Sequence, residues 1–418
     1  MTYETSVRRE RAVSVAGGQV GASREWLGQL DVLRLLGCLS VITIHCLGAP
    51  FDSQTVTVGW ITLLLHYSRE VFLFTSALVL ARAYYPQLTG AGRLADESGF
   101  RWRRLRQIGV PYLCWTTAYL LLALVHEPGA SFSATVRDLP LRWATLVATG
   151  TGWYHLYFLL VSLQFGLVFP LVLRLLRRTE GRHGRVLVVS FVLQAVTLYG
   201  YQRWGLPGTG WRALFGDASL PAYQFWLLCG AVVGAHLTAW HRAVLRYRPL
   251  VLAGLPLAAG ILTVVYLREL TTIGVGGASA PMQPVILLWA CAALAASYVA
   301  AVGLAGLRVS WLQLLFRRVG HLSFGIYLAH PFVLDLVMVV LRRLGLVRPD
   351  AGTVLLALAL TCVLTVSFCL LVLRTPVAGP LIGRSRPRVP AGTKASTANP
   401  PAVENSGRHV AGVGALQT

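Results

Sequence analysis

The feature that most constrains this chain is a series of ten long apolar segments. A helix needs roughly 17 to 25 residues to cross about 30 Å of hydrocarbon, and each segment is long enough. The segments lie near 29–49, 57–83, 109–126, 154–174, 186–202, 221–240, 249–267, 284–305, 321–341 and 352–373. The composition agrees, because 55% of the 418 residues are hydrophobic and only 13% are charged, outside the range of soluble globular proteins. We therefore predict an all-α, polytopic integral membrane protein with about ten transmembrane helices.

The placement of the basic residues predicts the orientation of these helices. The formal net charge of +21 could indicate a nucleic-acid partner. Ten spans, however, place most Lys and Arg residues on one side of the membrane, in the N-terminal tail, 82–108, 174–185, 236–248, 306–320 and the C-terminal tail. This positive-inside pattern, which Arg342, Arg343 and Arg348 oppose, predicts cytoplasmic termini in a multi-pass plasma-membrane protein. The charge then reflects topology and contact with membrane lipids, and we expect no nucleic acid.

Three regions follow from this topology. Residues 1–28 are polar and basic and lack the apolar core of a cleaved signal peptide, so we expect a cytoplasmic N-terminal tail. Residues 29–374 form the predicted ten-helix membrane domain. Residues 375–418 are rich in Pro, Gly, Ser, Thr and Arg, which predicts a disordered cytoplasmic C-terminal tail.

The sequence contains no common metal or nucleotide motif. All seven cysteines lie in or at the edge of apolar segments, without the spacing of metal ligands, so we expect neither disulfides nor a metal site. The chain also lacks the HExxH, Walker, dinucleotide-binding and GxSxG patterns. The ionisable residues inside the apolar segments are therefore the main candidates for chemistry.

The first apolar segment carries three such residues. Arg34 and His45 are separated by about 1100° of helical rotation and a rise of roughly 16 Å, so both side chains point to one face. Asp31, one turn before Arg34, can pair with its guanidinium. Because ionisable groups at depth usually face a cavity or a substrate path, this stripe favours a functional role. Alternatively, Asp31 and Arg34 anchor the helix end and His45 is a hydrogen-bonded core residue.

The second apolar segment contains the run HYSREVFLFTSALVLA. Arg69 and Glu70 fall near the middle of the span, and His66 lies one turn from Glu70 on the same face. His66 and Glu70 could form an acid/base pair, or the carboxylate could fix the tautomer of the imidazole. The alternative is an internal ion pair of Glu70 with Arg69 or Arg34 that holds the first two helices together.

A basic stretch, FRWRRLRQIGVPYLCW, precedes the third span at the predicted cytoplasmic face. Its four arginines are Arg101, Arg103, Arg104 and Arg106. Guanidinium groups in such a cluster bind phosphates bidentately, which favours a phosphate-bearing ligand. Lipid headgroups and topology would explain the same cluster.

Two later stretches place polar residues among aromatic ones. His155 lies in GTGWYHLYF, where an outer interfacial aromatic belt is the alternative explanation. Ser323, Tyr327 and His330 span about two helical turns in LSFGIYLAHP. A hydrogen-bonded bundle interior would also account for these three residues.

In their order along the chain, these motifs resemble the membrane-bound acyltransferase 3 family of multi-pass O-acyltransferases. The family's LDxLR pattern, with a His eleven residues after the Arg, is similar to Leu30–Arg34 and His45. Its acidic residue ahead of an FFxxSG run resembles Glu70 followed by FLFTSA, where Ala77 stands in place of the family's Gly. WYHLYFLLVSLQ and LSFGIYLAHP resemble later blocks of the branch that includes intercellular-adhesion and enterobacterial-glycan acetyltransferases.

The basic stretch resembles the family's RxxR motif in either of two registers. One register pairs Arg103 with Arg106. The other, counted back from Pro111, pairs Arg104 with Gln107 and lacks one Arg. Both registers stay open at the level of the sequence.

The resemblance implies an enzyme that transfers an acyl group, most simply acetyl, from cytoplasmic acyl-CoA to a hydroxyl of a cell-envelope glycan or another glycosylated acceptor. It implies acyl-CoA as a donor substrate and no permanently bound cofactor. We expect His45 to act as general base or to carry the acyl group briefly, and Glu70 and His66 to orient it. Candidate substrate-binding residues are Asp31, Arg34, Arg69, Arg103, Arg104, Arg106, His155, Ser323, Tyr327 and His330.

Two other functions fit the same pattern. A polysaccharide or lipid-linked sugar exporter would use the polar residues as a permeation path. An O-acyltransferase of a secondary metabolite would keep the chemistry and change the acceptor to a small glycosylated molecule.

Overall fold

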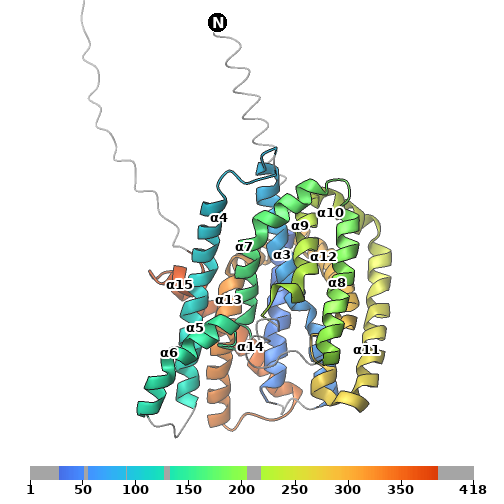
Figure 1. Cartoon of the computed structure of the whole chain (residues 1–418). Helices are drawn as coiled ribbons and strands as arrows, with labels where there is room; N and C mark the ends of the chain where they lie inside the picture. The colour runs from blue at the N-terminus through green and yellow to red at the C-terminus, as the bar shows by residue number, and fades with distance from the viewer. Residues whose placement is uncertain (1–27, 51–54, 91, 127–131, 205–217, 385–418) are drawn as a thin grey trace, which may run out of the picture.

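The computed structural model describes residues 28–50, 55–90, 92–126, 132–204 and 218–384. Within these ranges the regular structure is helical and includes no strand, which confirms the predicted all-α class (Figure 1). The predicted N-terminal tail, apart from Gly28, lies outside the described residues.

The helices pack together in one bundle (Figure 1). The first helix is Gly28–Gly48. It is followed by α2 (Val56–Leu65), α3 (Tyr67–Tyr84), α4 (Glu97–Arg104), α5 (Val110–His126), α6 (Phe132–Thr149), α7 (Tyr157–Arg178), α8 (His183–Trp204), α9 (Gln224–Ala235), α10 (Leu237–Arg246), α11 (Arg248–Ala278), α12 (Pro284–Ala305), α13 (Ser310–Arg343), α14 (Ala351–Val372) and α15 (Ala378–Ile382). Among the described residues, nine segments are long and apolar enough to cross a membrane, or ten if one bent helix pair is a single span. This result agrees with the predicted multi-pass architecture.

The bent pair corresponds to the predicted sixth span, 221–240. Leu220–Ala235 and Leu237–Arg246 meet at an angle of 100°. The break lies at His236, whose backbone is not helical. Because α10 contains His241, Arg242 and Arg246, it turns aside at the end of the bundle instead of continuing the span (Figure 1). The apolar sixth span therefore ends at Ala235, before the predicted boundary.

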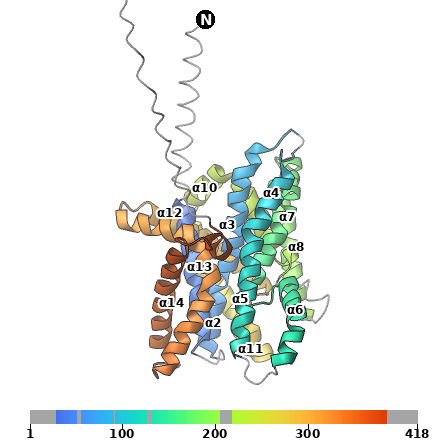
Figure 2. The ribbon, with the colours of Figure 1, turned by 90° about the vertical axis from the view of Figure 1, so that its left-hand side faces the viewer.

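The 18-residue helix α6 was not predicted as a separate element. It packs beside α5 (Figure 2). The Tyr112 hydroxyl donates to the Val147 carbonyl at 2.7 Å, and the Trp143 indole donates to the Thr117 hydroxyl at 3.0 Å. With Asp138 and Pro140 in its sequence, α6 falls short of a membrane span, and it instead leads the chain to the turn that carries His155.

Close packing of α9 against α3 fixes the position of the second span. A Cβ atom at Gly230 or Gly234 would collide with the backbone carbonyl of Phe74 or Leu78. Small residues four apart allow two helix backbones to approach closely in a membrane. Ala77, which stands where the related family has Gly, is fully buried in this contact, so the glycines that permit the approach lie on α9.

Part of the predicted C-terminal tail is ordered. After α14, a turn leads to the short helix α15, which packs against α5 and α13. The Trp115 indole donates to the Leu381 carbonyl at 2.8 Å, and Ile382 is buried. Residues 375–384 thus belong to the folded body, while 385–418 lie outside the described residues.

Candidate active site

Among the described residues the bundle contains cavities, three of which we name by their order along it. The basic-end cavity has a volume of about 240 Å³ and is lined by arginine and other polar side chains, including Arg34, Arg104, Gln107, Ser323 and Arg384. The central cavity has a volume of about 160 Å³ and is lined by His45, His66, Ser68, Arg69 and His155, among others. The distal cavity has a volume of about 310 Å³, and its lining includes His45, Trp153, Tyr154, Asp335 and Arg342.

Neighbouring cavities share lining residues, which shows that the three follow one another. Phe72, Phe158 and Tyr327, the aromatic trio, line both the basic-end and the central cavity. Their ring centroids are separated pairwise by 5.0 to 6.0 Å. His45 and Tyr154 line both the central and the distal cavity. Arg34 and His45 therefore line successive cavities, and the aromatic trio lies between the first two.

His45 lies where the central and distal cavities meet. Its side chain is half-buried. Its ring centroid is 4.2 Å from that of Tyr154 and 5.4 Å from that of His330, and the planes of the two imidazoles are inclined by only 25°. A molecule in either cavity can thus reach the His45 ring.

The His330-Pro331 sequence fixes the tautomer of His330. Proline has no backbone N–H, so Pro331 leaves the carbonyl of Tyr327 without its helical donor. His330 Nδ1 lies 2.8 Å from this carbonyl oxygen. Because a carbonyl only accepts, Nδ1 carries the hydrogen and Nε2 carries the free lone pair. His330 is fully buried, and its Nε2 has no hydrogen-bond partner among the described residues.

The hydroxyl of Tyr119, from α5, bridges the next pair of backbone groups in the interrupted helix α13. The Tyr119 hydroxyl donates to the Leu328 carbonyl at 2.8 Å and accepts from the backbone N–H of Phe332 at 3.3 Å. In an uninterrupted helix this N–H would donate to the Leu328 carbonyl directly. The two side chains together satisfy the backbone around Pro331 and hold the His330 ring in place.

His155 completes a group of three imidazoles. It lies in the turn between α6 and α7 and is only 2% exposed. Its ring centroid is 5.6 Å from His330 and 5.4 Å from Tyr327. The Tyr327 hydroxyl donates to the His155 carbonyl at 2.8 Å, which ties this turn to α13. Neither ring nitrogen of His155 has a hydrogen-bond partner among the described residues.

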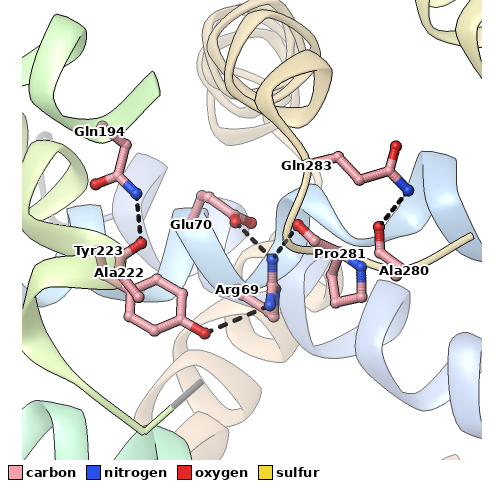
Figure 3. Close-up of polar contacts among 8 residues, drawn as sticks. All are labelled: Arg69, Glu70, Gln194, Ala222, Tyr223, Ala280, Pro281 and Gln283. Atoms are coloured by element: carbon pink, nitrogen blue, oxygen red, sulfur yellow. Dashed lines mark hydrogen bonds and ion pairs between the residues drawn. The ribbon is translucent and has the colours of Figure 1, made fainter. Parts of the chain in front are cut away.

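Arg69 and Glu70 form a buried anchor beside the central cavity (Figure 3). Arg69 Nη2 donates to Glu70 Oε1 at 3.0 Å and to the Pro281 carbonyl at 3.1 Å, while Nη1 donates to the Tyr223 hydroxyl at 3.4 Å. Figure 3 also shows Gln283 bonded to the Ala280 carbonyl, which steadies the loop that presents Pro281. Through these hydrogen bonds Arg69 joins α3 to the start of the sixth span and to the loop before α12.

The predicted pair of His66 and Glu70 is not a contact in the structure. His66 lies at the break between α2 and α3 and lines the central cavity. Glu70 is not among the lining residues, and within the described part of the chain its ion pair is with Arg69. Glu70 therefore reaches the cavity only through Arg69.

At the basic end, the arginines divide into two groups. Arg34 pairs with Asp31 at 3.3 Å, and Arg104 Nη1 donates to Gln107 Oε1 at 3.2 Å. Both arginines and Gln107 line the basic-end cavity. The spatial arrangement thus brings the second register of the arginine motif to the cavity.

The first register of that motif lies outside the cavity. Arg103 is exposed and pairs with Asp96 at 3.1 Å. Hydrogen bonds from the Gly99 backbone and from Arg103 lower the pKa of the Asp96 carboxyl. Arg106 is exposed as well and lines none of the three cavities. Residues Leu105–Gly109 form a π-helix, and this wider turn changes which side chains face inward.

Three charged lining residues were not among the predicted site residues. Asp335 and Arg342 line the distal cavity, and Arg384 lines the basic-end cavity. Asp335 follows Tyr327 by eight residues, a spacing that is compatible with one broad helix face. That periodicity could have identified Asp335, whereas no local pattern places Arg384 beside the first helix.

Comparison with known proteins assigns the chain to a family. A family model described as an acyltransferase domain matches residues 27–374, which covers most of the chain. No curated protein and no solved structure matches. The matched region contains every helix from the first to α14, together with the imidazole and arginine groups described above. The chain therefore belongs to the acyltransferase 3 family and is a membrane-embedded acyltransferase.

Proposed function

We propose that this enzyme transfers an acyl group, most simply acetyl, from cytoplasmic acyl-CoA to a hydroxyl of a cell-envelope glycan or another glycosylated acceptor. The observation that carries the proposal is the series of cavities between Arg34 and His45. In this proposal the protein lies in the plasma membrane with its basic end in the cytoplasm. The donor enters the basic-end cavity and the acceptor enters the distal cavity.

The basic-end cavity suits the anionic part of the donor. Arg34 and Arg104 present guanidinium groups there, and guanidinium forks bind phosphate oxygens strongly. The rise of roughly 16 Å between Arg34 and His45 requires a long, thin arm between phosphate and acyl group. The pantetheine arm of CoA has that form, and it would pass the aromatic trio to place the thioester in the central cavity.

The transfer step needs a proton acceptor beside the thioester. The acceptor hydroxyl gives its proton to an unprotonated imidazole nitrogen, and its oxygen bonds to the thioester carbonyl carbon. The bond from that carbon to sulfur breaks, and the departing thiolate takes up the proton. We assign the role of general base to His45 because it faces both cavities.

The surrounding residues position the reacting groups. His330 packs behind His45 and keeps an unprotonated Nε2. His66 faces the same cavity, and Glu70 acts through Arg69. Ser323, Tyr327 and His155 line the route of the donor or the place of the acyl group.

The decisive test uses purified protein in lipid nanodiscs with radiolabelled acetyl-CoA and extracted envelope glycans. General-base assistance contributes about 10²–10⁴ in rate, so His45→Ala should reduce transfer by that factor and remain folded. Transfer at the wild-type rate by this variant would exclude the assigned role. Mass spectrometry of glycans and glycosylated metabolites from cells with and without the gene would identify the acceptor.

An exporter could use the same series of cavities. Loss of glycan export on deletion of the gene, with glycan acylation unchanged, would support export. Loss of acylation with export intact would support acyl transfer.

A further inference from the structure

The strongest unexplained feature lies at the C-terminal end of the folded body. Gly383, directly after α15, has a φ of 64°, in the left-handed region that favours glycine. A Cβ atom there would lie 2.6 Å from the ring of Phe324 and 3.4 Å from the carbonyl oxygen of Gln107. The turn is therefore wedged between α13 and the π-helix beside the arginine motif.

This turn directs Arg384 into the basic-end cavity. Arg384 is exposed and lines the cavity together with Arg34 and Arg104. It also lies close enough to act electrostatically on both Asp31 and Arg34. Three guanidinium groups from the first helix, α4 and the segment after α15 thus converge on one space.

The described residues balance only part of the positive charge of this cavity. Within the described part of the chain, the only ion pair among these three arginines is the one between Arg34 and Asp31. Arg104 donates to the neutral amide of Gln107, and its buried Nε has no hydrogen-bond partner there. Three guanidinium groups that share one carboxylate partner favour an anion, and phosphate matches their geometry.

We propose that α15 and Arg384 form part of the donor-binding site, with Arg384 binding a phosphate of acyl-CoA beside Arg34 and Arg104. This inference rests on the proposed function and extends it. The family match ends at residue 374, so Arg384 is a contribution of this chain outside the matched domain. The segment after α14 then serves as one wall of the cavity.

A binding experiment measures the contribution of Arg384 to CoA affinity apart from that of the other arginines. CoA is titrated calorimetrically into the full-length protein in phosphatidylcholine nanodiscs, for the wild type, Arg384→Ala and Arg384→Lys. A hydrogen bond to a charged group corresponds to roughly a tenfold to hundredfold change in affinity, so Arg384→Ala should raise the Kd for CoA by that factor. Arg384→Lys should lose less affinity for CoA than Arg384→Ala does. The matched control is Arg318→Ala, an exposed arginine of α13 that lines none of the three cavities.

A truncated donor tests whether the effect depends on phosphate. S-acetylpantetheine keeps the thioester arm and lacks the phosphates of acetyl-CoA. Arg384→Ala should lower kcat/KM for acetyl-CoA and leave kcat/KM for S-acetylpantetheine unchanged. Equal losses with both donors would indicate a structural role and overturn the proposal, as would an unchanged Kd for CoA.

Phosphate could also come from a lipid headgroup, so the titration is repeated in nanodiscs that contain phosphatidylglycerol. If Arg384 binds a lipid headgroup instead of CoA, Arg384→Ala and the wild type will have the same Kd for CoA in both kinds of nanodisc, and the proposal fails. Failure of the wild type to bind CoA or to transfer acetyl would refute the proposed function itself. A second variant, Gly383→Ala, strains the turn and should weaken CoA binding while Arg384 is still present.

Discussion

At the scale of single residues, Pro331 and His330 link backbone chemistry to the surroundings of His45. The missing N–H of Pro331 exposes one carbonyl, and the His330 imidazole uses that carbonyl to fix its own tautomer. The result is a buried nitrogen lone pair within stacking distance of His45. The sequence pair His-Pro thus fixes the tautomer of the ring, and Tyr119 helps to hold the ring in place.

This relationship predicts the effect of Pro331→Ala. The new backbone N–H would compete for the Tyr327 carbonyl and release His330 Nδ1, so the tautomer would no longer be fixed. Alanine is also a better helix former than proline. We expect an unchanged or higher melting temperature together with a kcat at least about tenfold lower.

The matched control for this variant is Pro256→Ala, which removes another intrahelical proline, in α11, at an exposed position. It should leave the kcat unchanged. Wild-type activity in Pro331→Ala would show that the tautomer of His330 does not matter.

Arg69 and Glu70 give a residue-scale prediction about stability. Arg69→Met would leave the Glu70 carboxylate buried without its ion-pair partner, a loss of about 3–5 kcal/mol. Removing both charges, in Arg69→Met with Glu70→Gln, should recover part of that loss. Unfolding in mixed micelles measures both values. If the double variant is no more stable than the single one, the pair is not the source of the effect.

At the scale of helices, the contact between α3 and α9 determines where the second span lies. Gly230 and Gly234 allow the α9 backbone to approach the carbonyls of Phe74 and Leu78. Since α3 also carries Arg69 and Phe72, any displacement of α3 would move the anchor and one ring of the aromatic trio together.

Gly230→Ala tests this contact. The added methyl group would overlap the Phe74 carbonyl, and overpacking of this kind typically costs about 1–3 kcal/mol. We expect a lower melting temperature and a reduced yield of folded protein. Gly260→Ala in α11, where a Cβ atom meets nothing within 4 Å, is the control and should be neutral. Equal stability of the two variants would contradict the proposed packing.

At the scale of the whole molecule, the apolar segments predicted the membrane-spanning architecture well because the length and polarity of a span are local properties. The face shared by Arg34 and His45 was predictable for the same reason. The bend at His236 and the π-helix at Leu105–Gly109 depend on tertiary contacts, so the boundary of the sixth span and the register of the arginine motif could not be predicted. The convergence of Arg384 on the first helix is likewise a contact between the two ends of the fold.

The series of cavities also predicts acyl-chain selectivity. The acyl group must lie near His45 in a central cavity of about 160 Å³, with the aromatic trio behind it. Discrimination against one extra methylene by a tight apolar site is commonly about tenfold or more. The wild type should therefore prefer acetyl-CoA to butyryl-CoA.

Phe158→Ala should weaken that preference, because it removes a ring that separates the central cavity from the basic-end cavity. We expect the ratio of kcat/KM for butyryl-CoA to that for acetyl-CoA to rise about tenfold, with no comparable change in the Kd for CoA. Phe332→Ala, at a partly exposed ring of α13 outside the three cavities, should leave the ratio unchanged. An unaltered ratio in Phe158→Ala would mean that the acyl group does not pass or rest beside the aromatic trio, and that donor and acceptor meet by another route.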